Sequence, residues 1–143
     1  MEKLVVLCYV WAFGLSDKAD YYAELDRLFL ENPEDDFLLE LEGLGNDFRA
    51  ACSRLSCKIE EEIGVERFGK ELLAALEKHY NESIFSLEEF GELCYNIYCA
   101  LPGSIAFEYP FLSLCYALDE PVFGEVHSRQ WFQKLFNYYK EKP

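Results

Sequence analysis

Apolar residues recur at three- and four-residue spacings along most of this 143-residue chain, as they do on the buried side of an α-helix. The clearest stripe contains Phe48, Cys52, Leu55, Ile59 and Ile63, and Gly64 follows it as a stop signal. Similar stripes lie within residues 22–29, 68–80, 90–101 and 131–139. No segment alternates apolar and polar residues in the manner of a strand. The pattern predicts an all-α fold: a single compact, irregular bundle of six to eight helices, forming one domain over residues 1–143.

Local signals mark several helix ends. Residues 86–89 (Ser-Leu-Glu-Glu) spell a capping box, in which side chains satisfy backbone amides at a helix start. Residues 32–35 (Asn-Pro-Glu-Asp) offer an N-cap asparagine followed by a proline at the first helical position. Ser16 or Asp17 can cap the helix before them. Residues 119–121 (Asp-Glu-Pro) close a short apolar helix over residues 111–118, and we expect the last helix to begin near Ser128.

Residues 4–13 are almost continuously apolar, as in a secretory signal peptide. Such a peptide begins with positive charge and ends at a small-residue cleavage site, but here Glu2 offsets Lys3 and no such site follows. The run is also too short to cross a membrane as a helix. We therefore expect a buried first helix, with a buried strand as the less favoured alternative.

Six cysteines lie within the apolar helical patterns, at positions 8, 52, 57, 94, 99 and 115. Buried free cysteine behaves as a small hydrophobic residue. The pairs 52/57 and 94/99 are five residues apart, which separates their side chains by about 140° around a helix. This spacing does not suit a shared metal ion. We interpret the cysteines as reduced thiols and predict a cytoplasmic protein without a metal or other cofactor.

The formal net charge of −14 is the most unusual global property of the chain. It argues against nucleic acid and against an anionic membrane as partners, because both are bound through Lys and Arg. Between Arg27 and Arg49 there are seven acidic residues and no basic one, and between Lys78 and Arg129 there are eight acidic residues and again no Lys or Arg. These two acidic tracts either form a solvated surface that maintains solubility or steer a basic protein partner toward the chain.

The candidate partner-binding residues come from the two tracts. They are Glu34, Asp35, Asp36, Glu40, Glu42, Glu88, Glu89, Glu92, Asp119 and Glu120. Asp35 and Glu89 stand where they can instead stabilise helix starts.

Sequence motifs for catalysis are missing. The chain contains no phosphate-binding glycine loop, no dinucleotide fingerprint and no His-Glu-x-x-His zinc motif. Its two histidines, His79 and His127, are not part of a recognisable constellation. We therefore predict no catalytic residues and a protein that is not an enzyme. The alternative is a small helical enzyme that uses buried carboxylates or a cysteine paired with a histidine.

Residues 28–42 (LFLENPEDDFLLELE) and 108–121 (EYPFLSLCYALDEP), followed by an aromatic closing helix, resemble the small acidic all-helical immunity proteins of bacterial contact-dependent and polymorphic toxin systems. The resemblance implies a non-catalytic inhibitor that binds and neutralises a cognate basic toxin domain, such as a nuclease. It supplies no functional residues. The alternative is a structural or adaptor subunit that docks on another cytosolic protein, and the sequence makes no prediction about oligomeric state.

Overall fold

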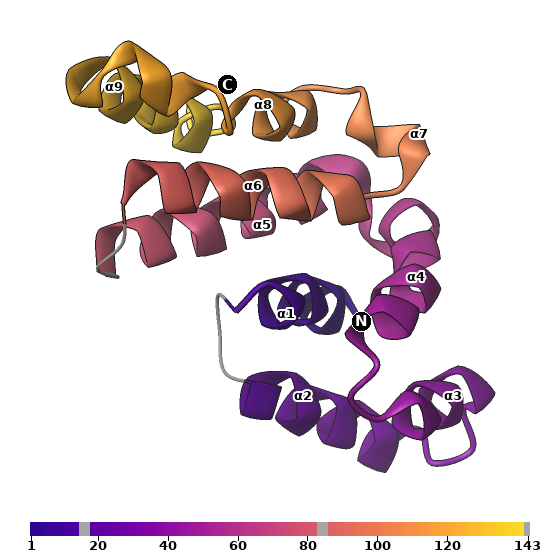
Figure 1. The fold of residues 1–143 in the computed structure, drawn as a ribbon. Coiled ribbons are helices and arrows are strands. Elements are labelled where there is room, and N and C mark those ends of the chain that lie inside the picture. Colours follow the sequence, from indigo (N-terminus) through magenta and orange to yellow (C-terminus); the bar gives the residue numbers. More distant parts are fainter. Residues whose placement is uncertain (15–17, 83–85, 142–143) are drawn as a thin grey trace. The chain divides into compact units, whose positions relative to one another are not determined.

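The computed structural model describes residues 1–14, 18–82 and 86–141, and it confirms the all-α fold (Figure 1). These residues form nine α-helices, one π-helical segment (η1) and one 3₁₀ segment (η2), with no strand among them. The number of helices exceeds the predicted six to eight. The additional one is α7 (Gly103–Ala106), a single turn in a region predicted to be a loop. It forms because the Pro102 carbonyl accepts hydrogen bonds from the backbone N–H groups of Ile105 and Ala106. The side chains of both residues are buried.

The chain divides into two compact units, residues 1–68 and 69–143. The first unit contains α1 (Glu2–Ala12), α2 (Lys18–Glu31), α3 (Asp36–Leu44), α4 (Phe48–Lys58) and η1 (Ile59–Ile63). The second contains α6 (Leu87–Ala100), α7, α8 (Phe111–Tyr116), η2 (Glu120–Phe123) and α9 (Glu125–Phe136), and the division falls within α5 (Val65–Glu82). The prediction of one domain over residues 1–143 stays a prediction.

Helix α1 is the centre of the first unit, where it packs against α2, α4 and η1. It is apolar on all sides, and such a helix is buried in the middle of a protein rather than at its surface. Its buried residues are Leu4, Val5, Val6, Cys8, Tyr9 and Val10. The apolar run at the N-terminus therefore forms a buried helix, as predicted. No described helix of the chain is both long and apolar enough to cross a membrane.

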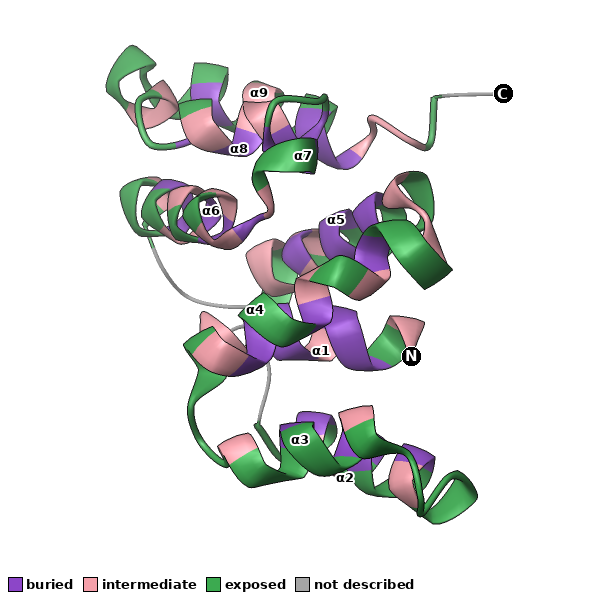
Figure 2. Ribbon diagram, turned by 90° about the vertical axis from the view of Figure 1, so that its right-hand side faces the viewer, coloured by how far each residue is buried: buried purple, intermediate pink, exposed green. Residues whose placement is uncertain are grey.

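The second unit has an aromatic core. Phe90 of α6 lies edge-on to Phe132 of α9, with 5.0 Å between ring centroids, and Tyr80 of α5 contacts both Phe90 (5.1 Å) and Phe136 (5.2 Å). Each such pair adds about 0.5–1.5 kcal/mol beyond the burial of its apolar area. Figure 2 shows that most helices have buried residues along one side and exposed residues along the other.

Two helices begin at residues other than those predicted, and the predicted caps Ser16 and Asp17 lie outside the described residues. Asn32 does not cap α3, because its N–H still donates to the Leu28 carbonyl at the end of α2 (3.0 Å). Asp35 is the cap instead. The last helix begins at Glu125, three residues before Ser128, since Gly124 with a φ of 101° allows the chain to turn directly into α9.

Candidate interaction surface

The first three acidic residues of the predicted surface lie at the start of α3, in the first unit. Asp35 Oδ1 accepts hydrogen bonds from the backbone N–H groups of Phe37 (2.9 Å) and Leu38 (3.3 Å). Glu34 and Asp36 on either side of it are exposed. Because an N-cap carboxylate stabilises a helix start through these bonds and the helix dipole, Asp35 has a structural role that requires no partner.

Glu40 and Glu42 are engaged by residues of other helices in the first unit. Glu40 forms an ion pair with Arg54 of α4, with 2.6 Å between Oε2 and Nη2. Glu42 lies close to Asp26 of α2, and burial together with a hydrogen bond to the Asp26 carboxyl raises the pKa of Glu42. Glu40 is therefore neutralised by a basic residue of its own unit, whereas Glu42 has an acidic neighbour.

Helix α4 also brings positive charge over the ring of Phe37 on α3. Lys58 Nζ lies 4.6 Å from the ring centroid and the guanidinium carbon of Arg54 lies 5.8 Å from it. Both distances are within the cation–π range of about 6 Å. The first acidic tract, between Arg27 and Arg49, contains no basic residue. In the folded protein, basic residues of the next helix, α4, lie beside it.

The acids of α6 are in a different environment. The Ser86 hydroxyl accepts a hydrogen bond from the Glu89 N–H (3.1 Å), which confirms the predicted helix start. Glu88 and Glu92 are exposed and stand one turn apart on the same side of α6. Within the described part of the chain, neither side chain forms an ion pair or hydrogen bond. No described basic residue compensates their charge.

Gly91 brings these acids close to the segment that follows α8. The backbone of Ala117 and Leu118 packs directly on Gly91: a Cβ there would overlap the Ala117 carbonyl oxygen and lie 3.5 Å from Leu118 Cα. Glu92 follows Gly91 in sequence, and Asp119, which is exposed, follows Leu118. The fold therefore gathers both parts of the second tract in one region of the second unit.

Glu120 stabilises the turn between η2 and α9. Its Oε2 lies 2.8 Å from His127 Nε2. The buried hydroxyl of Ser128 is within hydrogen-bonding distance of the carbonyl oxygens of Glu120 (3.0 Å) and Gly124 (2.8 Å). His127 also makes a ring contact with Phe123, with 5.3 Å between centroids. The half-buried Glu120 is therefore part of the structural support of this turn.

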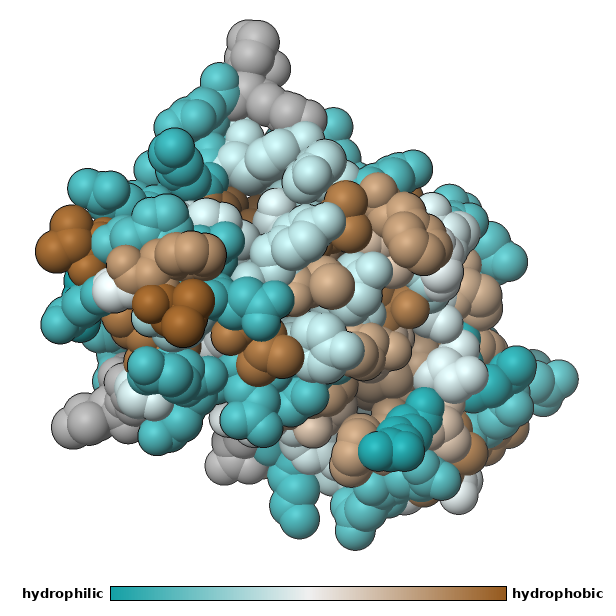
Figure 3. All heavy atoms as spheres, turned by 45° about the horizontal axis from the view of Figure 1, so that its top comes forward, coloured by the Kyte–Doolittle hydropathy of each residue, from teal (hydrophilic) through white to brown (hydrophobic). Residues whose placement is uncertain are grey.

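Four apolar side chains around the same turn point into solvent. They form what we call the η2 patch: Leu118 (43% exposed), Val122 (81%), Phe123 (66%) and Val126 (72%). Figure 3 views the side of the molecule that carries α8 and α9, and it shows hydrophobic residues at the surface bordered by hydrophilic ones. Sequence reasoning selected the neighbouring Asp119 and Glu120 and missed the patch itself.

One signal in the sequence could have located part of the patch. The buried stripe of α9 contains Phe132, Leu135 and Phe136. At 100° per residue, Val126 lies about 120° away from Phe132 around the helix, so it does not belong to that stripe. An apolar residue on the wrong side of an amphipathic helix is a candidate for exposure.

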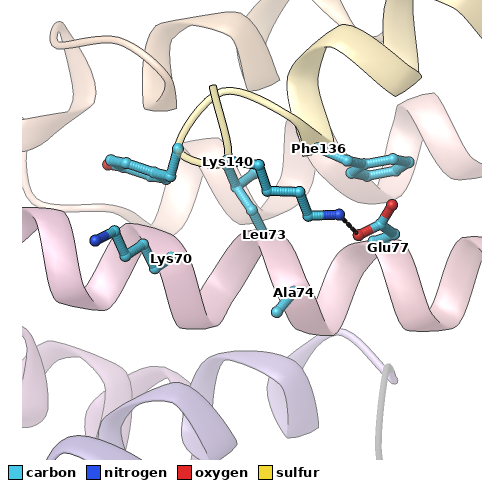
Figure 4. A pocket seen from close by; sticks show the side chains of 7 residues that line it. Lys70, Leu73, Ala74, Glu77, Phe136 and Lys140 are labelled. Atoms are coloured by element: carbon cyan, nitrogen blue, oxygen red, sulfur yellow. Dashed lines mark hydrogen bonds and ion pairs between the residues drawn. The ribbon is translucent and has the colours of Figure 1, made fainter. Parts of the chain in front are cut away.

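A separate pocket of about 240 Å³ lies in the second unit between α5 and the segment after α9 (Figure 4). Among its described lining residues the one carboxylate, Glu77, forms an ion pair with Lys140, with 2.5 Å between Oε1 and Nζ. This ion pair joins α5 to the segment after α9. The lining residues are Lys70, Leu73, Ala74, Glu77, Phe136, Tyr139 and Lys140.

All six cysteines are free in the structure, and the buried ones have the character of apolar residues. Cys8 and Cys52 face each other in the first unit with 3.5 Å between sulfur atoms, and this contact together with burial raises the pKa of Cys8. Burial also raises the pKa of Cys94. A nucleophilic or metal-binding cysteine needs a lowered pKa. Among the described residues, no group of three or more His, Cys, Asp and Glu side chains is placed to hold a metal ion.

The fold and the second tract define an acidic all-α protein with an exposed apolar patch. Neither a family model, nor a curated protein, nor a solved structure matches the chain. The resemblance to immunity proteins stays a prediction.

Proposed function

We propose that this chain is a non-catalytic acidic binding protein of the immunity type, which binds and neutralises a cognate basic toxin domain with nuclease activity. The observation that carries the proposal is the uncompensated charge of the second tract. Between Lys78 and Arg129 the chain has no Lys or Arg, and Glu88, Glu92 and Asp119 are exposed.

Uncompensated carboxylates suit a nuclease as the partner for a chemical reason. A nuclease binds the phosphates of its substrate in a basic groove. Carboxylates can occupy the same positions and block the groove without any reaction. Charge of this kind raises association rates by about 10- to 1,000-fold at low salt, while apolar anchors at the centre of the interface supply most of the affinity.

A docking subunit of a cytosolic complex is the second candidate. It is favoured by two further exposed aromatic residues, Phe107 and Tyr109, which lie in the turn before α8. Apolar contacts of this kind gain strength rather than lose it as salt is added. Salt dependence therefore separates the two candidates.

The test is capture of the partner from the native host with the tagged chain, under low-salt and high-salt washes. The proposal expects one basic domain that is released by salt. We further expect purified chain to inhibit the nuclease activity of that domain at a one-to-one ratio. A salt-resistant complex with a neutral or acidic protein, or a captured domain whose activity is unaffected, would contradict the proposal and favour the docking subunit.

A further inference from the structure

We infer that the η2 patch is the docking surface of the chain and that its partner is a basic protein surface with apolar side chains set between Lys and Arg residues. The inference rests on the proposed function, because it names where the basic partner binds. Its first support is the exposure of Val122, Phe123 and Val126 within five consecutive residues. A group of large apolar side chains that folding leaves in water, rimmed by polar residues, is typical of a protein–protein contact.

The turn that displays these side chains is held firmly. Ser128 is buried and its hydroxyl contacts two carbonyl groups of the turn, and the imidazole of His127 is placed between the Glu120 carboxylate and the Phe123 ring. Side chains on a braced turn lose little conformational freedom when a partner covers them. Rigid apolar anchors of this kind are where the binding energy of an interface concentrates.

The charges around the patch select the kind of partner. Asp119 and Glu125 are exposed beside the patch. Glu125 forms an ion pair with Arg129, with 3.0 Å between Oε1 and Nε, so of these two carboxylates only Asp119 has no basic partner among the described residues. A second copy of the chain would bring the same carboxylates against one another, which costs free energy. A surface with apolar side chains between Lys and Arg residues complements both the anchors and the acidic rim.

The experiment uses the full isotope-labelled chain and two synthetic peptides of equal length and equal positive charge. One peptide has leucines between its lysines and the other has serines. We expect the leucine peptide to shift the amide signals of residues 118–127 and to bind at least about tenfold more tightly than the serine peptide. Equal affinity for the two peptides, or shifts confined to other residues, would overturn the inference.

Matched variants locate the contact. Val122→Ser with Phe123→Ser should weaken binding of the leucine peptide about tenfold or more. Leu30→Ser, at an 82% exposed position of the first unit, should leave it unchanged. Since Val122 is 81% exposed, we expect the single variant Val122→Ser to fold. It replaces the double variant in the binding test if the double variant does not fold. An equal loss in Leu30→Ser would contradict the assignment.

The same variants separate this inference from the proposed function. If the double variant inhibits the captured nuclease as well as the unchanged chain does, the η2 patch is not the docking surface, but the proposed function is retained. If the leucine peptide binds at the η2 patch but no basic toxin domain is inhibited, the docking surface is retained and the proposed function is wrong.

Discussion

The second unit gathers exposed, unpaired acidic residues beside an exposed apolar patch. The first unit pairs some of its acidic residues, such as Glu40, and leaves others, such as Glu34 and Asp36, exposed. Residues 1–68 contain sixteen acidic and seven basic residues, and residues 69–143 contain eleven and six. Net charge alone would place the binding surface in the first unit. Yet Glu40 there is held by Arg54, while Glu88 and Glu92 of the second unit make no ion pair within the described part of the chain. The local surroundings of a carboxylate, namely its ion pairs and the apolar side chains beside it, therefore matter more than total charge for binding a partner.

The largest effect on stability is expected where the second unit gathers its acids. Gly91→Ala should destabilise the protein by about 1–3 kcal/mol, because the added Cβ overlaps the Ala117 carbonyl oxygen and the two segments must move apart. Gly43→Ala is the control: it lies in α3 with open space around it and should be neutral or stabilise by up to about 1 kcal/mol. Urea unfolding measures both. A Gly91→Ala protein as stable as the unchanged chain would mean that this close packing is not needed.

The next largest effect concerns a carboxylate that the first unit buries. Glu24 accepts hydrogen bonds from Arg27 at 2.6 and 3.2 Å, which lower the pKa of Glu24, and its side chain is 6% exposed. Glu24→Gln should cost about 1–2 kcal/mol at neutral pH. Glu92→Gln, at an exposed position in the second unit, should change stability by less than about 0.5 kcal/mol.

The pH dependence of the Glu24 effect has a definite sign. A carboxyl group whose pKa is lowered by folding contributes stability above its unfolded pKa of about 4.3 and loses it as the pH falls through the folded value. The difference between the unchanged chain and Glu24→Gln should therefore be largest at neutral pH and shrink in acid. Urea unfolding across this range checks it, and a difference that grows in acid would rule out the ion pair as its source.

The smallest effect distinguishes two adjacent tyrosines of the first unit. The Tyr22 hydroxyl lies 2.6 Å from Asn46 Oδ1 and 3.0 Å from the Gly45 carbonyl oxygen, so Tyr22→Phe should cost about 0.5–1.5 kcal/mol. The Tyr21 hydroxyl is buried and has no hydrogen-bond partner among the described residues. Tyr21→Phe should therefore be neutral or stabilising. Thermal unfolding of the two variants gives the comparison, and a larger loss for Tyr21→Phe would contradict it.

Local sequence signals predicted most of the fold. The stripe from Cys52 to Ile59 is buried, Gly64 ends the segment with a φ of 92°, and Ser86 caps α6. These features depend only on residues within a turn or two of each other. Phe48, predicted to be in the core, is exposed because it is the first residue of α4, at the edge of the packed region. The single turn of α7 was missed because four residues are too few to show a helical period.

The candidate surface was less accessible to sequence reasoning. The Glu40–Arg54 pair joins residues of two helices, fourteen positions apart, so no spacing rule for one helix reveals it. The exposure of Val122 and Phe123 depends on which side of a short turn the rest of the unit covers. Apolar residues in such a turn look the same in the sequence whether they are buried or exposed.

The most direct test of the account is a comparison of charge reversal in the two units. Glu34→Lys with Asp36→Lys changes the first unit, and Glu88→Lys with Glu92→Lys makes the same change in charge in the second. Glu34 and Asp36 lie at the start of α3, and Glu88 and Glu92 lie in the first two turns of α6, so small costs in stability are expected for both pairs. The association rate with the captured basic domain is then measured at low and high salt. The account predicts a reduction of about tenfold or more at low salt for the second pair and little change for the first. An equal or larger reduction for the first pair would contradict it.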